Sequence, residues 1–156
     1  MFKPSVLLLA VALAGTDQQP GRHASSGSPA PRVFVFTAEP KSTPPTEEEQ
    51  GRLDSVRDVR EALSKKAGLA MVSTAEEATV LIEVIEREKR DASGGFGGTS
   101  ITPLGETLIR LHLKCEEHET DIKGVAPGYW GKAAKDGADK AFKWIVRVSE
   151  GPGSRK

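Results

Sequence analysis

The sequence predicts an α+β fold, a two-layer sandwich in which a mixed sheet of four to five strands carries two helices packed on one face. Residues 46–67 and 129–148 place apolar side chains three and four positions apart, as amphipathic helices do. Residues 80–115 contain two stretches in which apolar and polar residues alternate, which is typical of half-buried strands. The order strand, helix, strand, antiparallel strands and helix fits such a sandwich.

The first strand is expected at residues 32–37, because β-branched and aromatic side chains there favour a strand with both faces largely covered. A proline-rich turn over residues 40–45 follows it. Thr46 and Glu49 then have the spacing of a capping box, so a helix should begin there and end near Ala67.

This first helix has one weak position near its beginning. Gly51 lowers the helix propensity, so a later start capped by Asp54 stays open as an alternative. The apolar stripe of the helix consists of Leu53, Val56, Val59 and Leu63.

Two strands are expected next, a short one at residues 69–72 and a longer one at residues 80–87. In the longer strand one side is apolar, whereas Glu83 and Arg87 are expected on the other, solvated side. Alternation resumes at residues 109–115, so these two longer strands should pair as a long antiparallel hairpin.

A further short strand is predicted at residues 119–126, followed by a helix from about Tyr129 to Val148 that packs on the sheet. The buried stripe of this helix is rich in alanine, which allows close approach to the sheet. It contains Trp130, Ala134, Ala138, Ala141, Ile145 and Val148.

The chain divides into four regions. They are a signal peptide at residues 1–14, a flexible linker at 15–31, a single α+β domain at 32–150 and a disordered tail at 151–156. Lys3 precedes an apolar run of the length of a secretory signal, too short to span a bilayer. Thr16 stands where a lipid-bearing cysteine would be needed. We therefore expect a periplasmic or secreted protein with no stable membrane anchor once the signal is removed.

The charge balance and the cysteine content exclude some classes of protein. Lysine and arginine number 22 and aspartate and glutamate number 22, so no global field recruits nucleic acid, and we expect no nucleic-acid partner. The single Cys115 cannot form an internal disulfide, so packing alone must stabilise the domain. No cofactor is expected.

The order of elements and the segment from Val72 to Val84, which includes Ala75-Glu76-Glu77-Ala78, resemble small bacterial envelope domains related to the TolB amino-terminal domain. The curli-secretion lipoprotein family has a similar arrangement, with a closing helix after a hairpin whose last strand ends near a glycine such as Gly124. The resemblance covers roughly Val33 to Val148. It implies an interaction role in the envelope, with no catalytic residues to carry over, and the missing lipidation cysteine sets this chain apart from the lipidated members.

His112, Cys115 and His118 place three zinc-ligand types within seven residues. If this segment is a strand, however, His112 and Cys115 point to opposite faces, and the alternation that buries Leu111 and Leu113 also buries Cys115. We therefore interpret Cys115 as a core thiol beside two exposed imidazoles. A metal site, or a thiol nucleophile with a histidine base, stays open as an alternative.

The connection between the two long strands is rich in glycine. It contains Gly94, Gly95, Phe96, Gly97 and Gly98, and no lysine follows in a P-loop frame. Such a loop is typical of a mobile connection or of a binding loop, with Phe96 as the residue most suited to contact a ligand.

Taken together, these features favour an exported, soluble, non-enzymatic envelope protein that binds another protein or a cell-wall component. The expected contact surfaces are the glycine-rich loop and any open sheet edge, which could accept a partner strand. The alternatives are a small metal-dependent or thiol hydrolase around His112, Cys115 and His118, and a self-assembling structural subunit.

Overall fold

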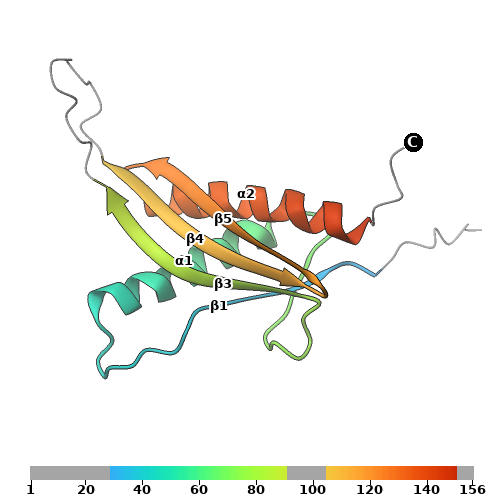
Figure 1. The fold of residues 1–156 in the computed structure, drawn as a ribbon, viewed down its shortest axis with the longest axis horizontal. Coiled ribbons are helices and arrows are strands. Elements are labelled where there is room, and N and C mark those ends of the chain that lie inside the picture. Colours follow the sequence, from blue (N-terminus) through green and yellow to red (C-terminus); the bar gives the residue numbers. More distant parts are fainter. Residues whose placement is uncertain (1–28, 91–104, 151–156) are drawn as a thin grey trace, which may run out of the picture.

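The computed structural model describes residues 29–90 and 105–150, and it confirms the α+β fold (Figure 1). The signal peptide, residues 15–28 of the linker, the glycine-rich loop and the tail lie outside the described residues. The elements are β1 (Arg32–Phe36), α1 (Glu47–Ser64), β2 (Ala70–Met71), β3 (Val80–Arg90), β4 (Glu106–Cys115), β5 (His118–Pro127) and α2 (Trp130–Ser149). Both helices lie on the same face of the sheet, as predicted.

The sheet is mixed, with the strand order β2-β1-β3-β4-β5. β1 runs parallel to β2 and β3, whereas β3, β4 and β5 form the expected antiparallel meander. β1 pairs with only the first part of β3, from Val33 opposite Val80 to Phe36 opposite Glu83. The second part of β3 therefore continues beyond the end of β1.

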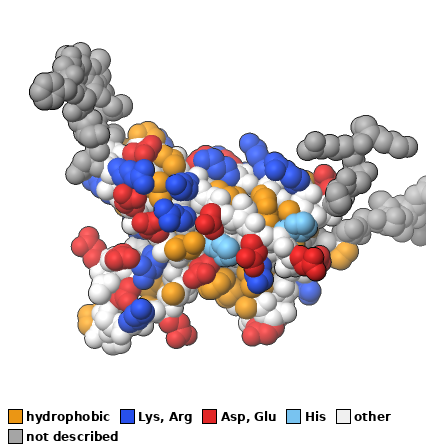
Figure 2. Space-filling view, viewed as in Figure 1, with side chains coloured by type: hydrophobic (Ala, Val, Ile, Leu, Met, Phe, Trp, Pro, Cys, Tyr) orange, Lys and Arg blue, Asp and Glu red, His pale blue; other side chains and the backbone are white. Residues whose placement is uncertain are grey.

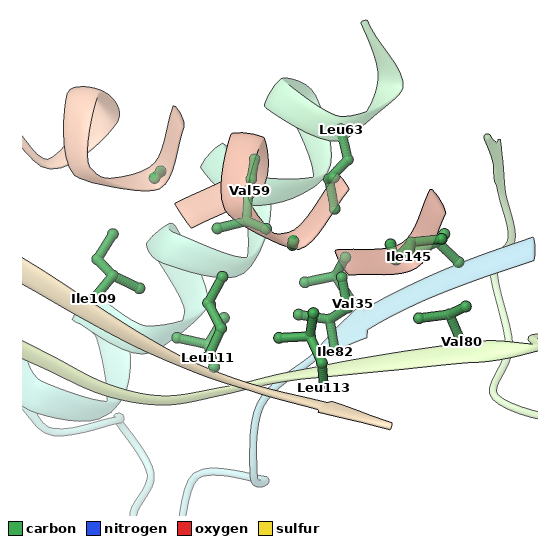
Figure 3. Packing of buried hydrophobic residues seen from close by; sticks show 14 of the residues in the cluster. Val35, Val59, Leu63, Val80, Ile82, Ile109, Leu111, Leu113 and Ile145 are labelled. Atoms are coloured by element: carbon green, nitrogen blue, oxygen red, sulfur yellow. The ribbon is translucent and has the colours of Figure 1, made fainter. Parts of the chain in front are cut away.

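The core fills the space between the sheet and the two helices (Figure 3). Val33 and Val35 of β1 face it and are 0% and 2% exposed. Phe34 and Phe36 lie on the opposite face, where their rings stack at 5.7 Å and are partly exposed. The expected cover over both faces of this strand is therefore complete only on the helix side. The largest buried side chains that the other elements contribute to this core are Val59, Leu63, Val80, Ile82, Val84, Ile109, Leu111, Leu113 and Ile145.

The first helix begins where the capping box predicted. The Thr46 hydroxyl accepts a hydrogen bond from the Glu49 N–H, and the Glu49 carboxylate accepts one from the Thr46 N–H. The alternative start at Asp54 is therefore wrong. The helix ends at Ser64, three residues before the predicted Ala67, because the chain turns there toward Gly68, which has a φ of +85°.

The second helix packs closely on β5 through glycine and alanine, as its predicted stripe indicates. A Cβ atom on Gly124 would lie 2.2 Å from the carbonyl oxygen of Ala133 and 2.7 Å from the nitrogen of Gly137. Only a glycine fits at this crossing. Because this contact fixes the height of α2 above the sheet, it also positions Trp130 at the start of that helix. Within the described residues, no helix is both long enough and apolar enough to cross a membrane.

Candidate binding groove between β3 and α1

A groove of about 770 Å³ lies where the second part of β3 passes the first turns of α1. Its walls include Glu47, Gln50 and Asp54 of α1, Arg87 and Lys89 of β3, and Trp130 of α2. This volume lies within the usual range of ligand sites in proteins.

A β-bulge places the β3 side chains in this groove. The pairing of β3 with β4 shifts by one residue between Val84 and Glu86, which sets Arg87 opposite the buried Ile109. Arg87 therefore lies on the helix side, and the prediction that it shares the solvated face with Glu83 is wrong. The bulge reverses the alternation of faces, which periodicity alone cannot detect.

Arg87 of β3 contacts the walls formed by α1 and α2. Its guanidinium donates a hydrogen bond to the Gly51 carbonyl at 2.8 Å, lies 3.7 Å from the Asp54 carboxylate and stacks over the Trp130 ring at 4.0 Å. Partial burial lowers the pKa of Arg87, and the carboxylate of Asp54 opposes this shift. The Arg87 side chain also explains why a glycine stands at the weak helix position 51. A Cβ atom at Gly51 would lie 3.0 Å from the Arg87 Cδ atom.

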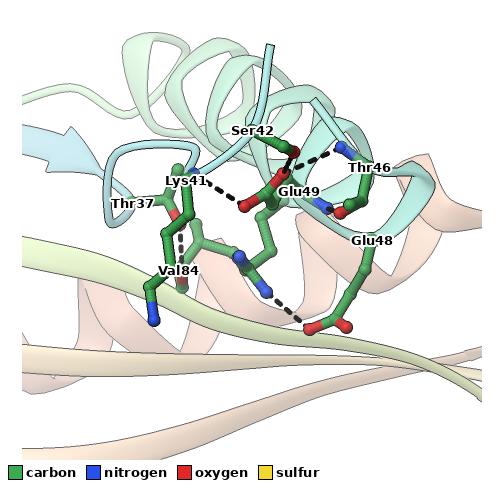
Figure 4. A network of polar contacts seen from close by, with 8 residues as sticks. Thr37, Lys41, Ser42, Thr46, Glu48, Glu49 and Val84 are labelled. Carbon is green, nitrogen blue, oxygen red and sulfur yellow. Dashed lines mark hydrogen bonds and ion pairs between the residues drawn. The ribbon is translucent and has the colours of Figure 1, made fainter. Parts of the chain in front are cut away.

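The α1 wall is anchored by the carboxylate of Glu49, which is 8% exposed (Figure 4). It accepts hydrogen bonds from the Lys41 N–H at 2.8 Å, the Ser42 hydroxyl at 2.7 Å and the Thr46 N–H at 2.8 Å. These donors, the Ser42 hydroxyl first, lower the pKa of Glu49 from 4.5 to about 2. The segment leading into α1 is therefore bound to the first turn of the helix.

The backbone of β3 has a free edge beside the groove. The Thr37 hydroxyl donates to the Val84 carbonyl at 2.8 Å, which shows that Val84 directs its carbonyl away from β4 (Figure 4). On β5 the Val125 N–H and the Lys123 carbonyl point outward, so by alternation across β4 it is Arg110 and Leu108 that direct their backbone groups toward β3. Beyond the bulge, Glu86 and Glu88 are therefore the residues that hydrogen-bond to β4. Because backbone groups alternate along a strand, those of Arg87 and Lys89 point away from β4.

The open face of the sheet carries charges of both signs between apolar patches (Figure 2). Ion pairs between neighbouring strands neutralise many of these charges. They join Glu86 to Arg110 at 3.1 Å, Lys114 to Glu119 at 2.9 Å and, when the imidazole is protonated, His112 to Asp121 at 2.7 Å. Opposite charges on neighbouring strands are typical of a solvated face.

The predicted ligand types His112, Cys115 and His118 do not converge. Cys115 belongs to the core and is 9% exposed, which confirms its predicted burial, and desolvation raises its pKa. His112 lies on the opposite face and contacts Asp121, while His118 is exposed. No group of three or more histidine, cysteine or acidic residues within 29–90 and 105–150 is placed to hold a metal ion.

The sequence also predicted contact surfaces at the glycine-rich loop and at any open sheet edge. The glycine-rich loop with Phe96 lies outside the described residues. The outer edge of β5 is partly closed, since the Val125 N–H donates to Asp136 at 2.9 Å and Lys140 donates to the Lys123 carbonyl at 2.8 Å. The opposite edge strand, β2, has only two residues.

A second hollow, of about 290 Å³, lies between the two helices. Its charged side chains already pair with one another: Lys66 and Lys135 with Asp139, and Lys65 with Glu61. A charged ligand would have to displace these pairs, so the groove beside β3 is the stronger candidate.

No protein-family model and no curated protein matches the chain. Among solved structures, a PelC dodecamer from Paraburkholderia phytofirmans is similar, with 11% identity, coverage of 72% of this chain and 83% of that one, and a TM-score of 0.42. The hypothetical protein CT253 from Chlamydia trachomatis has 11% identity, coverage of 77% and 94%, and a TM-score of 0.36. Both likenesses are weak and concern the fold. The resemblance to TolB amino-terminal and curli-secretion domains is not confirmed by these comparisons.

Proposed function

We propose that this chain is an exported, non-enzymatic binding module of the bacterial envelope, and that it binds another protein through the groove between β3 and α1. The observation that carries the proposal is the free backbone edge of β3 beside a groove with anchored walls. Export and a periplasmic or secreted location rest on the leader-like first 14 residues. The envelope-domain resemblance agrees with such a role.

The contacts of several lining side chains support a binding surface whose shape is fixed before a partner arrives. Thr46 caps α1, Asp54 faces Arg87, and Arg87 is committed to Gly51 and Trp130. Glu47 and Lys89 also line the groove and form no ion pair within the described residues, so their charges are available to a partner. The alternative hydrolase has less support, because its proposed thiol faces the core and His112 faces the opposite side.

Site-specific photocrosslinking in intact cells tests this proposal. A photoreactive residue replaces Gln50, an exposed side chain of the groove, and a matched control places it at Glu117, which is exposed in the β4–β5 turn. We expect one reproducible envelope protein, identified by mass spectrometry, from position 50 and not from position 117. Equal capture from both positions, or from neither, contradicts the proposal, and crosslinks between two copies of the chain would favour self-assembly instead.

A further inference from the structure

Within residues 29–90 and 105–150, one strand position of the sheet is vacant. β1 ends its pairing with β3 at Glu83, and β3 continues to Arg90 with β4 as its other neighbour. We infer that an extended peptide segment of the protein partner adds to the sheet at this position, alongside residues 85–89 of β3. This inference rests on the proposed function and specifies how the groove recognises its partner.

The backbone of β3 is suited to strand addition on this side. The pairs Glu86–Arg110 and Glu88–Leu108 direct their hydrogen bonds toward β4, so the N–H and C=O groups of Arg87 and Lys89 face the vacant position. No backbone group of residues 29–90 or 105–150 hydrogen-bonds to them from this side. The Thr37 hydroxyl, directly after β1, donates to the Val84 carbonyl, just before the residues of β3 that lack a neighbour on this side.

The other sheet edges are less suited to such pairing. Asp136 and Lys140 occupy two outward backbone groups of β5, and Pro127 at its end has no N–H to donate. β2 offers two residues only. The second part of β3 differs from both, because among the described residues neither a neighbouring strand nor a helix side chain closes it and it lies beside the groove.

The charges beside the vacant position define the chemistry of the peptide. Asp54 and Glu48 already face arginines, and Glu86 and Glu88 of the open face are also paired. Lys89 on the β3 side and Glu47 on the α1 side form no ion pair within the described residues, and both line the groove. The complementary strand therefore carries an acidic side chain opposite Lys89 and a basic one toward Glu47.

The apolar part of the contact comes from Ile85 at the bulge, whose side chain is 40% exposed. Side chains of an added strand alternate between the groove and the open face of the sheet. Main-chain hydrogen bonds then supply affinity, while the alternating side chains supply selectivity, as in other cases of strand addition.

Defined peptides test this inference without knowledge of the natural partner. The probe is a blocked peptide of about eight residues, ~26 Å long when extended, in which glutamate and lysine alternate on one face and valine occupies the other. Two control peptides have the same sequence with every second amide N-methylated. One carries the methyl groups on the odd-numbered amides and the other on the even-numbered amides, so each blocks hydrogen bonds along one edge of the peptide. Binding is followed by backbone amide shifts and hydrogen exchange of the isotope-labelled full chain.

We expect saturable binding of the unmodified peptide, slowed exchange at the amides of Arg87 and Lys89, and at least about tenfold weaker binding of one of the two methylated peptides. Lys89→Glu should weaken binding similarly. Lys89→Pro should abolish the protection while the chain stays folded, because the N–H of Lys89 points away from β4. Asp121→Pro, at an outward position of β5, is the matched control and should bind as wild type does.

Three results overturn strand addition: no binding up to about 1 mM peptide, equal binding of all three peptides, or slowed exchange outside β3 only. If Lys89→Pro fails to fold, Lys89→Glu and the methylated peptides still decide. The crosslinking experiment at Gln50 is independent of these outcomes. Capture of an envelope protein there, together with failure of all peptides, would preserve the proposed function and refute this mode of recognition.

Discussion

Replacing Gly124 by alanine is expected to lift α2 away from the sheet. The added Cβ atom would lie 2.2 Å from the Ala133 carbonyl oxygen, 2.7 Å from the Gly137 nitrogen and 2.9 Å from the Gly137 Cα atom. All three are backbone atoms, so no rotation of a side chain can relieve the overlap. The helix must move by an ångström or more, and Trp130 at its start moves with it.

The cost of this substitution should reach the upper end of the range for overpacking, about 3 kcal/mol of unfolding free energy. For a domain of this size, a loss of 1 kcal/mol lowers Tm by about 4 °C, so we expect a decrease of about 12 °C in a thermal melt followed by circular dichroism. Gly131→Ala is the matched control, because a Cβ atom there has no neighbour within 4 Å. It should be neutral or stabilising by up to about 1 kcal/mol. A Gly124→Ala melt equal to that of the control would refute the close contact between β5 and α2.

Three further predictions concern stability and reactivity. The pKa of Glu49 lies near 2 in the folded chain and near 4.5 in the unfolded one, so its stabilising effect is present above pH 4.5 and is lost as the pH falls toward 2. In urea titrations, the loss of unfolding free energy caused by Glu49→Gln should therefore shrink over that pH interval. A loss that does not depend on pH would contradict this. Arg87→Met should lower the unfolding free energy by about 1–2 kcal/mol, because the stacking on Trp130 and one hydrogen bond are lost. In a Trp144→Phe background, the same substitution should shift the emission of Trp130, and an unchanged spectrum would argue against the stack. Thiol reagents at neutral pH should modify Cys115 far more slowly in the folded chain than in urea, because the thiol is buried and its pKa is raised; equal rates would show that the thiol is accessible.

Local signals predicted most of the elements. The capping box at Thr46 marked the start of α1 to the residue, because the two hydrogen bonds that define it involve neighbours in sequence. The hairpin of β3 and β4 followed from alternation over two segments, which fixes the buried face wherever the register is regular. The same alternation correctly assigned Cys115 to the core.

Sequence periodicity could not locate the irregularities that form the groove. The bulge after Val84 reverses the faces of β3, so Arg87 contacts residues far away in sequence, at Gly51 and Trp130. Nothing local in the sequence shows that β1 leaves the sheet at Phe36 while β3 continues. A groove formed by separate segments thus depends on tertiary pairing, whereas composition alone drew attention to the glycine-rich loop.

The role of Glu49 was likewise only half predictable. Its position in the capping box follows from spacing, but its contacts with Lys41 and Ser42 depend on how the preceding segment folds back. The result is a more strongly perturbed carboxylate than a helix cap alone requires.

We propose that the groove beside the second part of β3 holds a protein partner in the cell envelope. The most direct measurement is photocrosslinking from position 50 in intact cells, comparing the otherwise native chain with a Lys89→Glu chain expressed at the same level. We expect capture of one envelope protein by the first and loss of that capture in the second, since Lys89 lines the same groove. No capture by either chain would contradict a partner in the groove, and undiminished capture by the Lys89→Glu chain would contradict its contact with Lys89.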